Sequence, residues 1–547
     1  TGCYYVGGLF GTVSASLDAQ AASLANAQGT VSAVAYAGGL AGNITGPSIE
    51  TAGFTNYMNL SVSGHGYAGG LFGDVQYSVA DGATTELLLD LGTTENLGSI
   101  SAPNEYNEYS TAFNGYVGGI AGRIYSTQYD IHVKGTVTNS ADLTVAGERI
   151  SGLFGSVNAT KSLGGSPAQY EQKYLILEGT FRNDGDLSGV SRYANSNNMG
   201  GIVGRVDGSF RLTEGSSAEN RGSLRSTGAS YFGGIVGMVT YANNDCTAVF
   251  DGNASNLGAI YAENGSYLGG ILGGLSGGNN NLNYVGTLSF GGKGTLLNEG
   301  NLSGQSQMGG IFGGIIRNYN GSVSVVFEGK AVNTGAIEGK AGAIGGIGGN
   351  IALTNNTANL EQAGALTLGG IWENAGSVSG AGSYVGGNLG CANFTANVAT
   401  LADAGTFTLS GTWTNTGSVT NVGSSYTGGN IGTLSATSPV NDMVAFVMEE
   451  NTVLQNDASV TAVGYTGGNL GYFNWNAAST TAATPEALSF RGNWSNTGRI
   501  VGSGSNVGGN LGYLGWNAAA MTAGANAASL LGVWSNTGSV ECTGGSV

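Results

Sequence analysis

The sequence predicts an all-β protein, an elongated β-solenoid of about fourteen stacked repeats with roughly three short strands in each. A phrase made of an aromatic or apolar residue, Gly-Gly, an apolar residue or Asn, any residue and Gly recurs fourteen times. Successive copies lie 31 to 49 residues apart, a period typical of solenoids, propellers and arrays. Period-two alternation rich in Thr, Val and aromatic residues accompanies each copy, as expected of half-buried strands.

The Gly-Gly pair is the first element of the repeat. Residues without a Cβ allow a sharp backbone bend or the close approach of another chain segment. Fourteen copies at one phase favour such a geometric role over fourteen binding loops, and we read the pair mainly as a bend. Examples of these structural positions are Gly7, Gly8, Gly69, Gly70, Gly233, Gly234, Gly428 and Gly429, while Ser151 replaces the first glycine once.

A second phrase, Asn-x-Gly followed by any residue and then an apolar one, precedes most Gly-Gly pairs. Asn and Gly both tolerate positive φ, so this phrase predicts a turn. An alternating stretch such as Thr406 to Leu409 precedes the turn and predicts a strand. The Ala-rich stretches 14–27 and 516–530 are read as loops or short strands, because helical patterns of ten or more residues are hard to find.

Equivalent residues of a solenoid lie one above another, about 4.8 Å apart. Two columns follow from this spacing. Tryptophans two residues before the turn Asn are expected to form an aromatic stack, and Asn residues after the last four Gly-Gly pairs are expected to hydrogen-bond along the axis. The columns consist of Trp372, Trp413, Trp494 and Trp534, with Leu454 between them, and of Asn388, Asn430, Asn469 and Asn510.

These columns divide the chain by motif. Residues 1–349 carry Gly-Gly followed by an apolar residue, whereas residues 350–547 carry Gly-Gly-Asn and the Trp column. We expect one continuous solenoid across both parts. The last repeat stops between its Asn-x-Gly and the next expected Gly-Gly, so we read the chain as a window from a longer molecule.

Composition argues against several classes of partner. The formal charge is −17, from 34 acidic and 17 basic residues, which disfavours nucleic acids and anionic membranes. The four cysteines are far apart and form no metal-ligand spacing. No run of eighteen apolar residues predicts a transmembrane helix.

No motif points to catalysis, a cofactor or a metal. His65 and His132 lie in different repeats without a partner that reads as a triad, so both are expected to be surface or packing residues. The run from Asn183 to Asp186 offers oxygen ligands for Ca²⁺, but it does not recur, and a turn is the preferred reading.

The repeated phrase resembles a known motif. Tyr67 to Gly73 and Tyr231 to Gly237 are similar to the GLUG motif of large bacterial surface and secreted proteins, which include adhesins and some immunoglobulin-cleaving peptidases. The resemblance covers nearly the whole chain and implies an extracellular, β-rich repeat region of a bacterium. It implies no catalysis, because in the peptidases the motif lies outside the catalytic domain. The Gly-Gly-Asn form and the long repeats depart from the motif.

We therefore expect a non-enzymatic structural or adhesive protein at the cell surface or outside the cell, forming a stalk, an adhesin passenger or a filament. Its expected partners are a second copy stacked end to end, the remainder of a longer chain, or a glycan or protein on a host or other surface. Two alternatives stay open. Four-stranded blades with this period would make a β-propeller that binds ligands, and a carbohydrate-processing β-helix would need carboxylates converging on one face.

Overall fold

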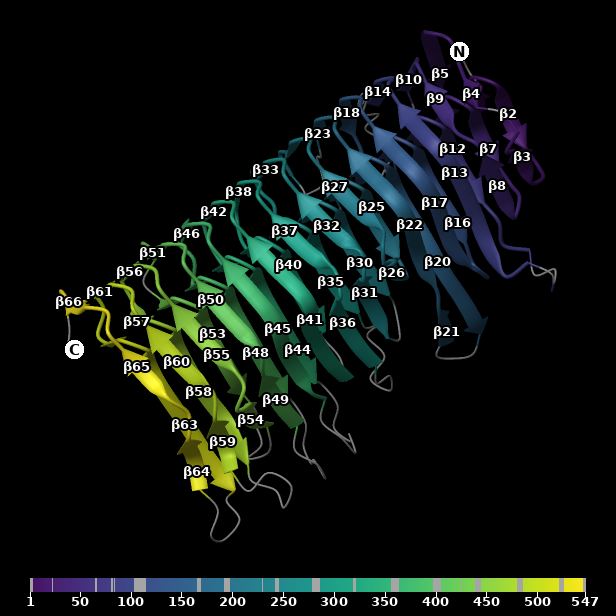
Figure 1. Ribbon diagram of the computed structural model, residues 1–547. Coiled ribbons are helices and arrows are strands. Elements are labelled where there is room, and N and C mark those ends of the chain that lie inside the picture. The colour runs from purple at the N-terminus through teal and green to yellow at the C-terminus, as the bar shows by residue number, and fades with distance from the viewer. Residues whose placement is uncertain are drawn as a thin grey trace, which may run out of the picture. The chain divides into compact units, whose positions relative to one another are not determined.

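The computed structural model describes residues 3–21, 23–63, 66–79, 82, 84–102, 115–164, 169–190, 197–228, 230–241, 245–277, 286–317, 321–355, 364–396, 405–423, 425–437, 444–479, 486–520 and 526–544 (Figure 1). Within these residues every regular element is a strand. No helix among them is long and apolar enough to cross a membrane. Parallel strands stack coil upon coil, which confirms the predicted β-solenoid and contradicts the propeller alternative.

The chain forms two compact units. Unit 1 comprises residues 1–241, 247–266 and 270–274, and unit 2 comprises residues 242–246, 267–269 and 275–547. The motif change at residue 350 lies inside unit 2. In both units one coil passes through four sheets, which we name A to D in the order in which the chain meets them.

Unit 1 contributes the following strands. Sheet A contains β1 (Tyr5–Gly7), β6 (Tyr36–Gly38), β11 (Tyr67–Gly69), β15 (Tyr116–Gly118), β19 (Arg149–Ser151), β24 (Asn198–Gly200) and β29 (Tyr231–Gly233). Sheet B contains β2 (Phe10–Val13), β7 (Ala41–Ile44), β12 (Phe72–Gln76), β16 (Ala121–Ser126), β20 (Phe154–Gly164), β25 (Val203–Asp207) and β30 (Val236–Tyr241), and β21 (Gln169–Gln172) pairs with β20 in antiparallel fashion. Sheet C contains β3 (Leu17–Ala19), β4 (Leu24–Ala25), β8 (Ser48–Thr51), β9 (Phe54–Asn56), β13 (Glu86–Asn96), β17 (Asp130–Asn139), β22 (Tyr174–Asn183), β26 (Ser209–Leu212), β27 (Ser217–Asn220), β31 (Cys246–Phe250) and β32 (Asn253–Asn256). Sheet D contains β5 (Gly29–Ala33), β10 (Met58–Val62), β14 (Ile100–Ala102), β18 (Leu143–Ala146), β23 (Leu187–Val190), β28 (Leu224–Ser226) and β33 (Ile260–Ala262).

Unit 2 repeats this plan. Sheet A contains β34 (Tyr267–Gly269), β39 (Met308–Gly309), β43 (Ala343–Gly345), β47 (Tyr384–Gly386), β52 (Tyr426–Gly428), β57 (Tyr465–Gly467) and β62 (Val507–Gly508). Sheet B contains β35 (Leu272–Gly277), which begins in unit 1, and β40 (Phe312–Arg317), β44 (Gly348–Asn355), β48 (Leu389–Ala396), β53 (Ile431–Thr437), β58 (Leu470–Ser479) and β63 (Leu511–Ala520). Sheet C contains β36 (Gly286–Gly292), β37 (Thr295–Asn298), β41 (Gly321–Asn333), β45 (Leu366–Asn374), β49 (Gly405–Leu409), β50 (Thr412–Asn415), β54 (Val444–Met448), β55 (Val453–Asn456), β59 (Glu486–Phe490), β60 (Asn493–Asn496), β64 (Asn526–Leu530) and β65 (Trp534–Asn536). Sheet D contains β38 (Leu302–Gly304), β42 (Ile337–Gly339), β46 (Val378–Gly380), β51 (Val419–Asn421), β56 (Val460–Ala462), β61 (Ile500–Gly502) and β66 (Val540–Cys542).

Strands of successive coils pair in parallel with equivalent residues opposite each other. Tyr36 lies opposite Tyr67, and Gly38 lies opposite Gly69. Side chains alternate between the interior and the solvent, as the burial of β41 shows. The apolar residue after Gly-Gly faces inward in the coils that follow the first, so Leu71 and Ile235 are 1% and 0% exposed, whereas Leu9 in the first coil is 47% exposed. The core of each unit is therefore a set of apolar columns that run from coil to coil.

The coil contains one sheet more than the sequence predicts. Sheet B follows directly after Gly-Gly, where the run Leu-x-Gly or Ile-x-Gly looks too rich in glycine to be a strand. Sheet C holds the sharpest corner of the coil. Glycines four residues before the turn Asn adopt positive φ there, at 54° in Gly92, 126° in Gly135, 125° in Gly179, 93° in Gly370 and 82° in Gly411. The left-handed bend thus lies in sheet C and not at Gly-Gly.

Candidate functional site, the asparagine and tyrosine columns

The turn asparagines form a buried ladder along each unit. In unit 1, each Nδ2 donates to the Oδ1 of the equivalent Asn in the next coil, at 2.6 to 2.8 Å, through Asn26, Asn56, Asn96, Asn139, Asn183, Asn220 and Asn256. In unit 2, the same bonds of 2.7 to 2.8 Å connect Asn298, Asn333, Asn374, Asn415, Asn456, Asn496 and Asn536. Most of these amides are fully buried. Each one therefore finds its partners within the stack.

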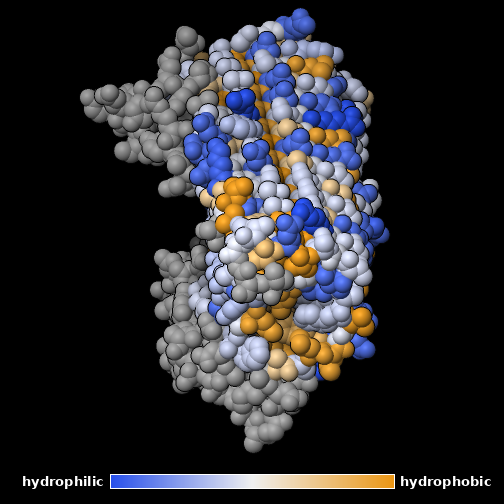
Figure 2. All heavy atoms as spheres, turned by 90° about the vertical axis from the view of Figure 1, so that its left-hand side faces the viewer, coloured by the Kyte–Doolittle hydropathy of each residue, from blue (hydrophilic) through white to orange (hydrophobic). Residues whose placement is uncertain are grey.

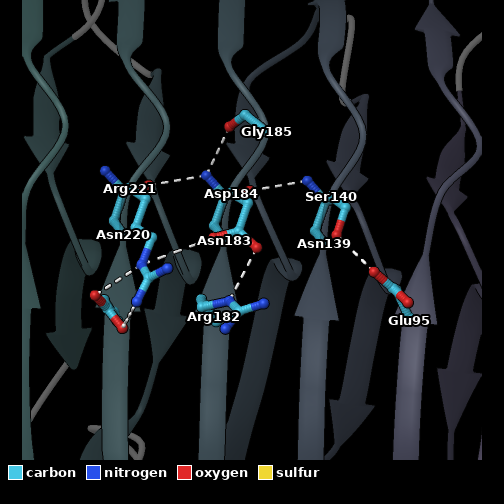
Figure 3. Close-up of polar contacts among 10 residues, drawn as sticks. Glu95, Asn139, Ser140, Arg182, Asn183, Asp184, Gly185, Asn220 and Arg221 are labelled. Atoms are coloured by element: carbon cyan, nitrogen blue, oxygen red, sulfur yellow. Dashed lines mark hydrogen bonds and ion pairs between the residues drawn. The ribbon is translucent and has the colours of Figure 1, made fainter.

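The same amides also close the turn that follows them. The second N–H of Asn183 donates to the carbonyl oxygen of Gly185 at 2.8 Å (Figure 3). The second N–H of Asn333 donates to the carbonyl oxygen of Gly335 at 2.9 Å. A buried carboxamide has two donors and one acceptor oxygen to satisfy. The ladder supplies partners for all three functions, which explains why Asn stands at this position.

The Gly-Gly pair faces this ladder across the coil. A Cβ on Gly70 would collide with the carbonyl oxygen of Gly119 in the next coil and with the side chain of Asn96 in its own coil. Gly234 and Gly429 meet the equivalent atoms, and Gly8 meets the Gly39 carbonyl. The first glycine has a different neighbour, the carbonyl oxygen three residues later, and this holds for Gly7, Gly69, Gly233 and Gly428.

Close approach is therefore the reason for Gly-Gly, because no described pair has positive φ. The second glycine of each pair lies at a bend, as predicted, but this bend does not use positive φ. Asn-x-Gly likewise forms the predicted turn, closed by its Asn amide, without positive φ. Its glycine is needed because a Cβ on Gly98, Gly222 or Gly258 would collide with the turn of the preceding coil.

A second ladder runs beside the first in unit 2. Asn388 donates to Asn430 at 2.6 Å, Asn430 to Asn469 at 2.6 Å and Asn469 to Asn510 at 2.7 Å. The Nδ2 of Asn388 also donates to the carbonyl oxygen of Thr414 at 3.1 Å. The ladder begins at Asn388, whose buried Oδ1 has no hydrogen-bond partner because the preceding coil carries Ile347 at this position.

The tryptophans of unit 2 lie against one another in pairs. The ring centroids of Trp372 and Trp413 are 3.9 Å apart, with the planes inclined by 13°. Those of Trp494 and Trp534 are 4.4 Å apart, with an inclination of 11°. Leu454 lies between the pairs, opposite Trp413 and Trp494. The indole N–H of Trp413 donates to the carbonyl oxygen of Ser410 at 2.8 Å, so the buried ring keeps its polar atom satisfied.

Sheet A of unit 1 carries a column of partly exposed tyrosines. The rings of Tyr5 and Tyr36 stack with centroids 4.6 Å apart, and those of Tyr67 and Tyr116 with centroids 4.8 Å apart. Tyr36 and Tyr67 between these pairs meet edge to face, with centroids 5.2 Å apart and planes inclined by 75°, so the column alternates between stacked and edge contacts. Burial raises the pKa of Tyr67 to about 12, which keeps this phenol protonated.

Arg123 on β16 of sheet B packs against this tyrosine column. The guanidinium of Arg123 lies 4.5 Å from the ring centroid of Tyr67 and 5.1 Å from that of Tyr125. Arg123 also donates two hydrogen bonds to Asp74, Nε to Oδ1 at 2.8 Å and Nη2 to Oδ2 at 2.7 Å. Burial raises the pKa of the Asp74 carboxyl above its ordinary value, although Arg123 opposes this shift. The pair is a buried, hydrogen-bonded ion pair beneath the tyrosines.

The acidic turn singled out in the sequence lies beside the ladder. The carboxylate of Asp184 accepts a hydrogen bond from Nε of Arg182 at 2.9 Å, and Nε of Arg221 lies 3.9 Å from its other oxygen (Figure 3). Asp186 accepts hydrogen bonds from the backbone N–H and the hydroxyl of Ser223. These contacts fit the preferred turn reading, because arginine occupies the carboxylate that Ca²⁺ would need.

The structure describes one of the two histidines, His132. His132 lies on sheet C between two carboxylates, with Nδ1 3.1 Å from Glu86 and Nε2 2.9 Å from Glu178. His65 lies outside the described residues. In the described part of the chain, no group of three or more His, Cys, Asp or Glu side chains has the geometry of a metal site.

One shallow depression opens on sheet D of unit 2. It measures about 360 Å³ and is lined by Glu338, Gly339, Lys340, Ser379, Gly380, Ala381, Thr420 and Val422. Its lining contains one carboxylate, whereas hydrolysis of a glycosidic bond usually employs two. The depression therefore lacks the carboxylate pair that the carbohydrate-processing alternative requires.

Comparison with protein family models, with curated proteins and with solved structures finds no match for this chain. The resemblance to the GLUG motif stays a prediction.

Proposed function

We propose that this chain is a non-enzymatic structural and adhesive repeat protein that acts outside a bacterial cell, as a stalk, an adhesin passenger or a filament. The observation that carries the proposal is the asparagine ladder. The polar side chains that recur in every coil bond to their own neighbours in the stack and are buried. Side chains that bond to one another within the stack stiffen it, and a soluble substrate cannot reach them.

The composition supports the same function. Only 9% of the residues are charged, and no repeated column of acidic or basic side chains accompanies the Gly-Gly or Asn-x-Gly phrases. The stacking of Asn, Trp and Tyr columns adds stabilising contacts with every added coil. In repeat proteins of this kind, stability is approximately a sum of coil terms and nearest-neighbour terms. This arrangement fits a scaffold whose length is set by the number of coils.

The proposed partner is a further coil, supplied by a longer chain or by a second copy stacked end to end. The last described coil of unit 2 exposes side chains whose equivalents are buried elsewhere. Leu530 is 56% exposed, whereas Phe490, its neighbour in the preceding coil, is fully buried. Leu531 and Val533 are 65% and 68% exposed, but they occupy outward-facing positions, since the equivalent Arg491 and Asn493 of the preceding coil are exposed as well. Figure 2 shows apolar residues on this side.

Electron microscopy of the purified chain tests the scaffold proposal. We expect single rods at low concentration and longer filaments as the concentration rises, if copies stack on one another. The variant Leu530→Asp should shorten the filaments, while Val422→Asp on a lateral face should leave them unchanged. Ring-shaped particles would contradict the proposal.

Antibody labelling of the source cells tests the location. Labelling of intact cells is the expected result, whereas labelling only after permeabilisation would exclude a surface role. The enzyme alternative is tested by incubation with polysaccharides of several classes. If the chain cleaves a polysaccharide and Glu338→Gln abolishes this cleavage, the non-enzymatic proposal is wrong.

A further inference from the structure

We propose that Tyr426 and Tyr472 form an oxidative cross-linking site, at which a one-electron oxidant of the haem peroxidase and hydrogen peroxide class joins two successive coils through a dityrosine bond. The proposal concerns a covalent modification and goes beyond the scaffold function proposed above. It starts from the only face of unit 2 on which the described tyrosines gather into a cluster.

Five tyrosines make up this cluster, which we name the unit 2 tyrosine cluster. Tyr426 and Tyr472 have ring centroids 4.0 Å apart and planes inclined by 27°. Tyr513 stacks on the other face of the group, 4.9 Å from Tyr472. Tyr384 and Tyr465 flank Tyr426 on sheet A, at 5.7 and 5.3 Å. No other tyrosine pair among the described residues is recorded at a shorter distance than Tyr426 and Tyr472.

Strand register and a small neighbour bring this pair together. Tyr426 belongs to β52 in sheet A, and Tyr472 belongs to β58 in sheet B of the next coil. The residue paired with Tyr472 in the preceding coil is Thr433, which is 2% exposed and too short to fill the corner. The ring of Tyr472 therefore lies over that of Tyr426. The two residues are 46 positions apart in the chain, so a bond between them would link coils that otherwise hold together by noncovalent contacts.

The pair is accessible as well as close. Tyr426 and Tyr472 are partly exposed, and Tyr513 is 36% exposed. An oxidant in solution can thus remove an electron from the cluster without entering the core. Burial nevertheless raises the pKa of Tyr472 to about 12, so the phenol is protonated at neutral pH and must release a proton when it is oxidised.

The tyrosines of unit 1 provide a contrast within the same chain. Arg123 lies over the ring of Tyr67 and Arg149 over the ring of Tyr116, each 4.5 Å from the centroid. A guanidinium ion over the ring opposes removal of an electron, because the radical cation would carry the same sign of charge. In the described part of unit 2, no guanidinium lies over a ring of the cluster. Cross-linking should therefore favour Tyr426 and Tyr472 over Tyr67 and Tyr116.

The chemistry balances with hydrogen peroxide as the oxidant. Each phenol loses one electron and one proton and becomes a phenoxyl radical. The two radicals couple through their Cε carbons, and the hydrogen on each of these carbons then passes to the phenol oxygen. The two electrons and two protons released reduce one hydrogen peroxide to two waters. The product retains both hydroxyl groups and is lighter than the starting protein by two hydrogen atoms.

The test treats the folded chain with a peroxidase and a limiting amount of hydrogen peroxide. The expected product has the mass loss of two hydrogens, the blue fluorescence of dityrosine, and a proteolytic peptide pair joined through Tyr426 and Tyr472. Tyr472→Phe preserves the stacked ring but lacks the phenol, so it cannot form this product and should lower the total dityrosine yield by about tenfold. Tyr67→Phe is the matched control and should leave the yield unchanged.

Guanidinium-unfolded protein provides the second comparison. Because proximity raises the effective concentration of the two phenols, the intramolecular yield should fall about tenfold on unfolding. Three results would overturn the proposal. These are an undiminished yield in Tyr472→Phe, a product that joins Tyr67 to Tyr116 in preference, and dityrosine found solely between separate molecules.

Discussion

Replacement of one ladder asparagine measures what the ladder contributes to stability. Asn183 is fully buried and takes part in three hydrogen bonds, with Asn139, Asn220 and Gly185, each 2.8 Å long. Asn183→Ala removes all three without adding bulk. At a net value of about 1 kcal/mol for each bond, the unfolding free energy should fall by about 3 kcal/mol. The partners left unsatisfied raise the expected range to about 3 to 5 kcal/mol.

Equilibrium unfolding in guanidinium chloride, followed by far-ultraviolet circular dichroism, provides the measurement. Asn59→Ala is the matched control, since this exposed residue accepts bonds from the backbone and hydroxyl of Ser99 and should cost less than about 1 kcal/mol. Hydrogen exchange should show lost protection in the coils next to residue 183. If the stability of Asn183→Ala lies within about 0.5 kcal/mol of the unchanged protein, the ladder is not a stabilising element.

Three further predictions use the same unfolding assay. Gly152→Ala places a Cβ against the ladder and the next coil and should cost more than about 3 kcal/mol, whereas Gly29→Ala, whose Cβ would only touch the Cε of Met58 at 4.0 Å, should stay within about 0.5 kcal/mol; equal costs would refute the close-approach argument. Trp413→Leu removes a stacked, fully buried ring and should cost about 3 kcal/mol, so an unchanged midpoint would show that the column does not stabilise unit 2. Arg123→Leu leaves the buried Asp74 without its partner and should cost about 3 to 5 kcal/mol at pH 7. Burial already raises the pKa of the Asp74 carboxyl, and loss of the guanidinium raises it further. The variant therefore keeps its stability below pH about 4, where the carboxyl is neutral in both states, and loses stability as the pH rises through the folded pKa. A cost independent of pH would contradict this reasoning.

The sequence predicts the architecture because the repeat is visible in composition alone. Fourteen Gly-Gly phrases and the alternation around them are enough to indicate stacked coils and parallel strands. Equivalent residues such as Asn388 and Asn430 can be placed in one column, since a solenoid repeats its geometry in every coil.

What the sequence does not reveal depends on contacts across the coil. Gly70 meets Asn96, 26 positions later, and a single sequence gives no sign that these two phrases face each other. The ladder formed by Asn183 and its equivalents shows the same recurrence as the Asn388 column, yet the following glycine made a turn the more obvious explanation. Tyr472 lies over Tyr426 because Thr433 is small, a relation that involves two coils. These features arise from packing between neighbours, and the pattern of a single repeat does not show which residues meet.

The ladder also has a direction. Every Nδ2 donates toward the C-terminal neighbour, from Asn139 to Asn183 and from Asn183 to Asn220. A finished coil therefore offers an N–H donor to the coil that follows it. During synthesis this favours growth from the amino end, with each completed coil acting as a template for the next. Because the junction is the same at every step, gene recombination that removes or duplicates a whole coil would restore the ladder at the seam, and such a protein can change in length without redesign of its interior.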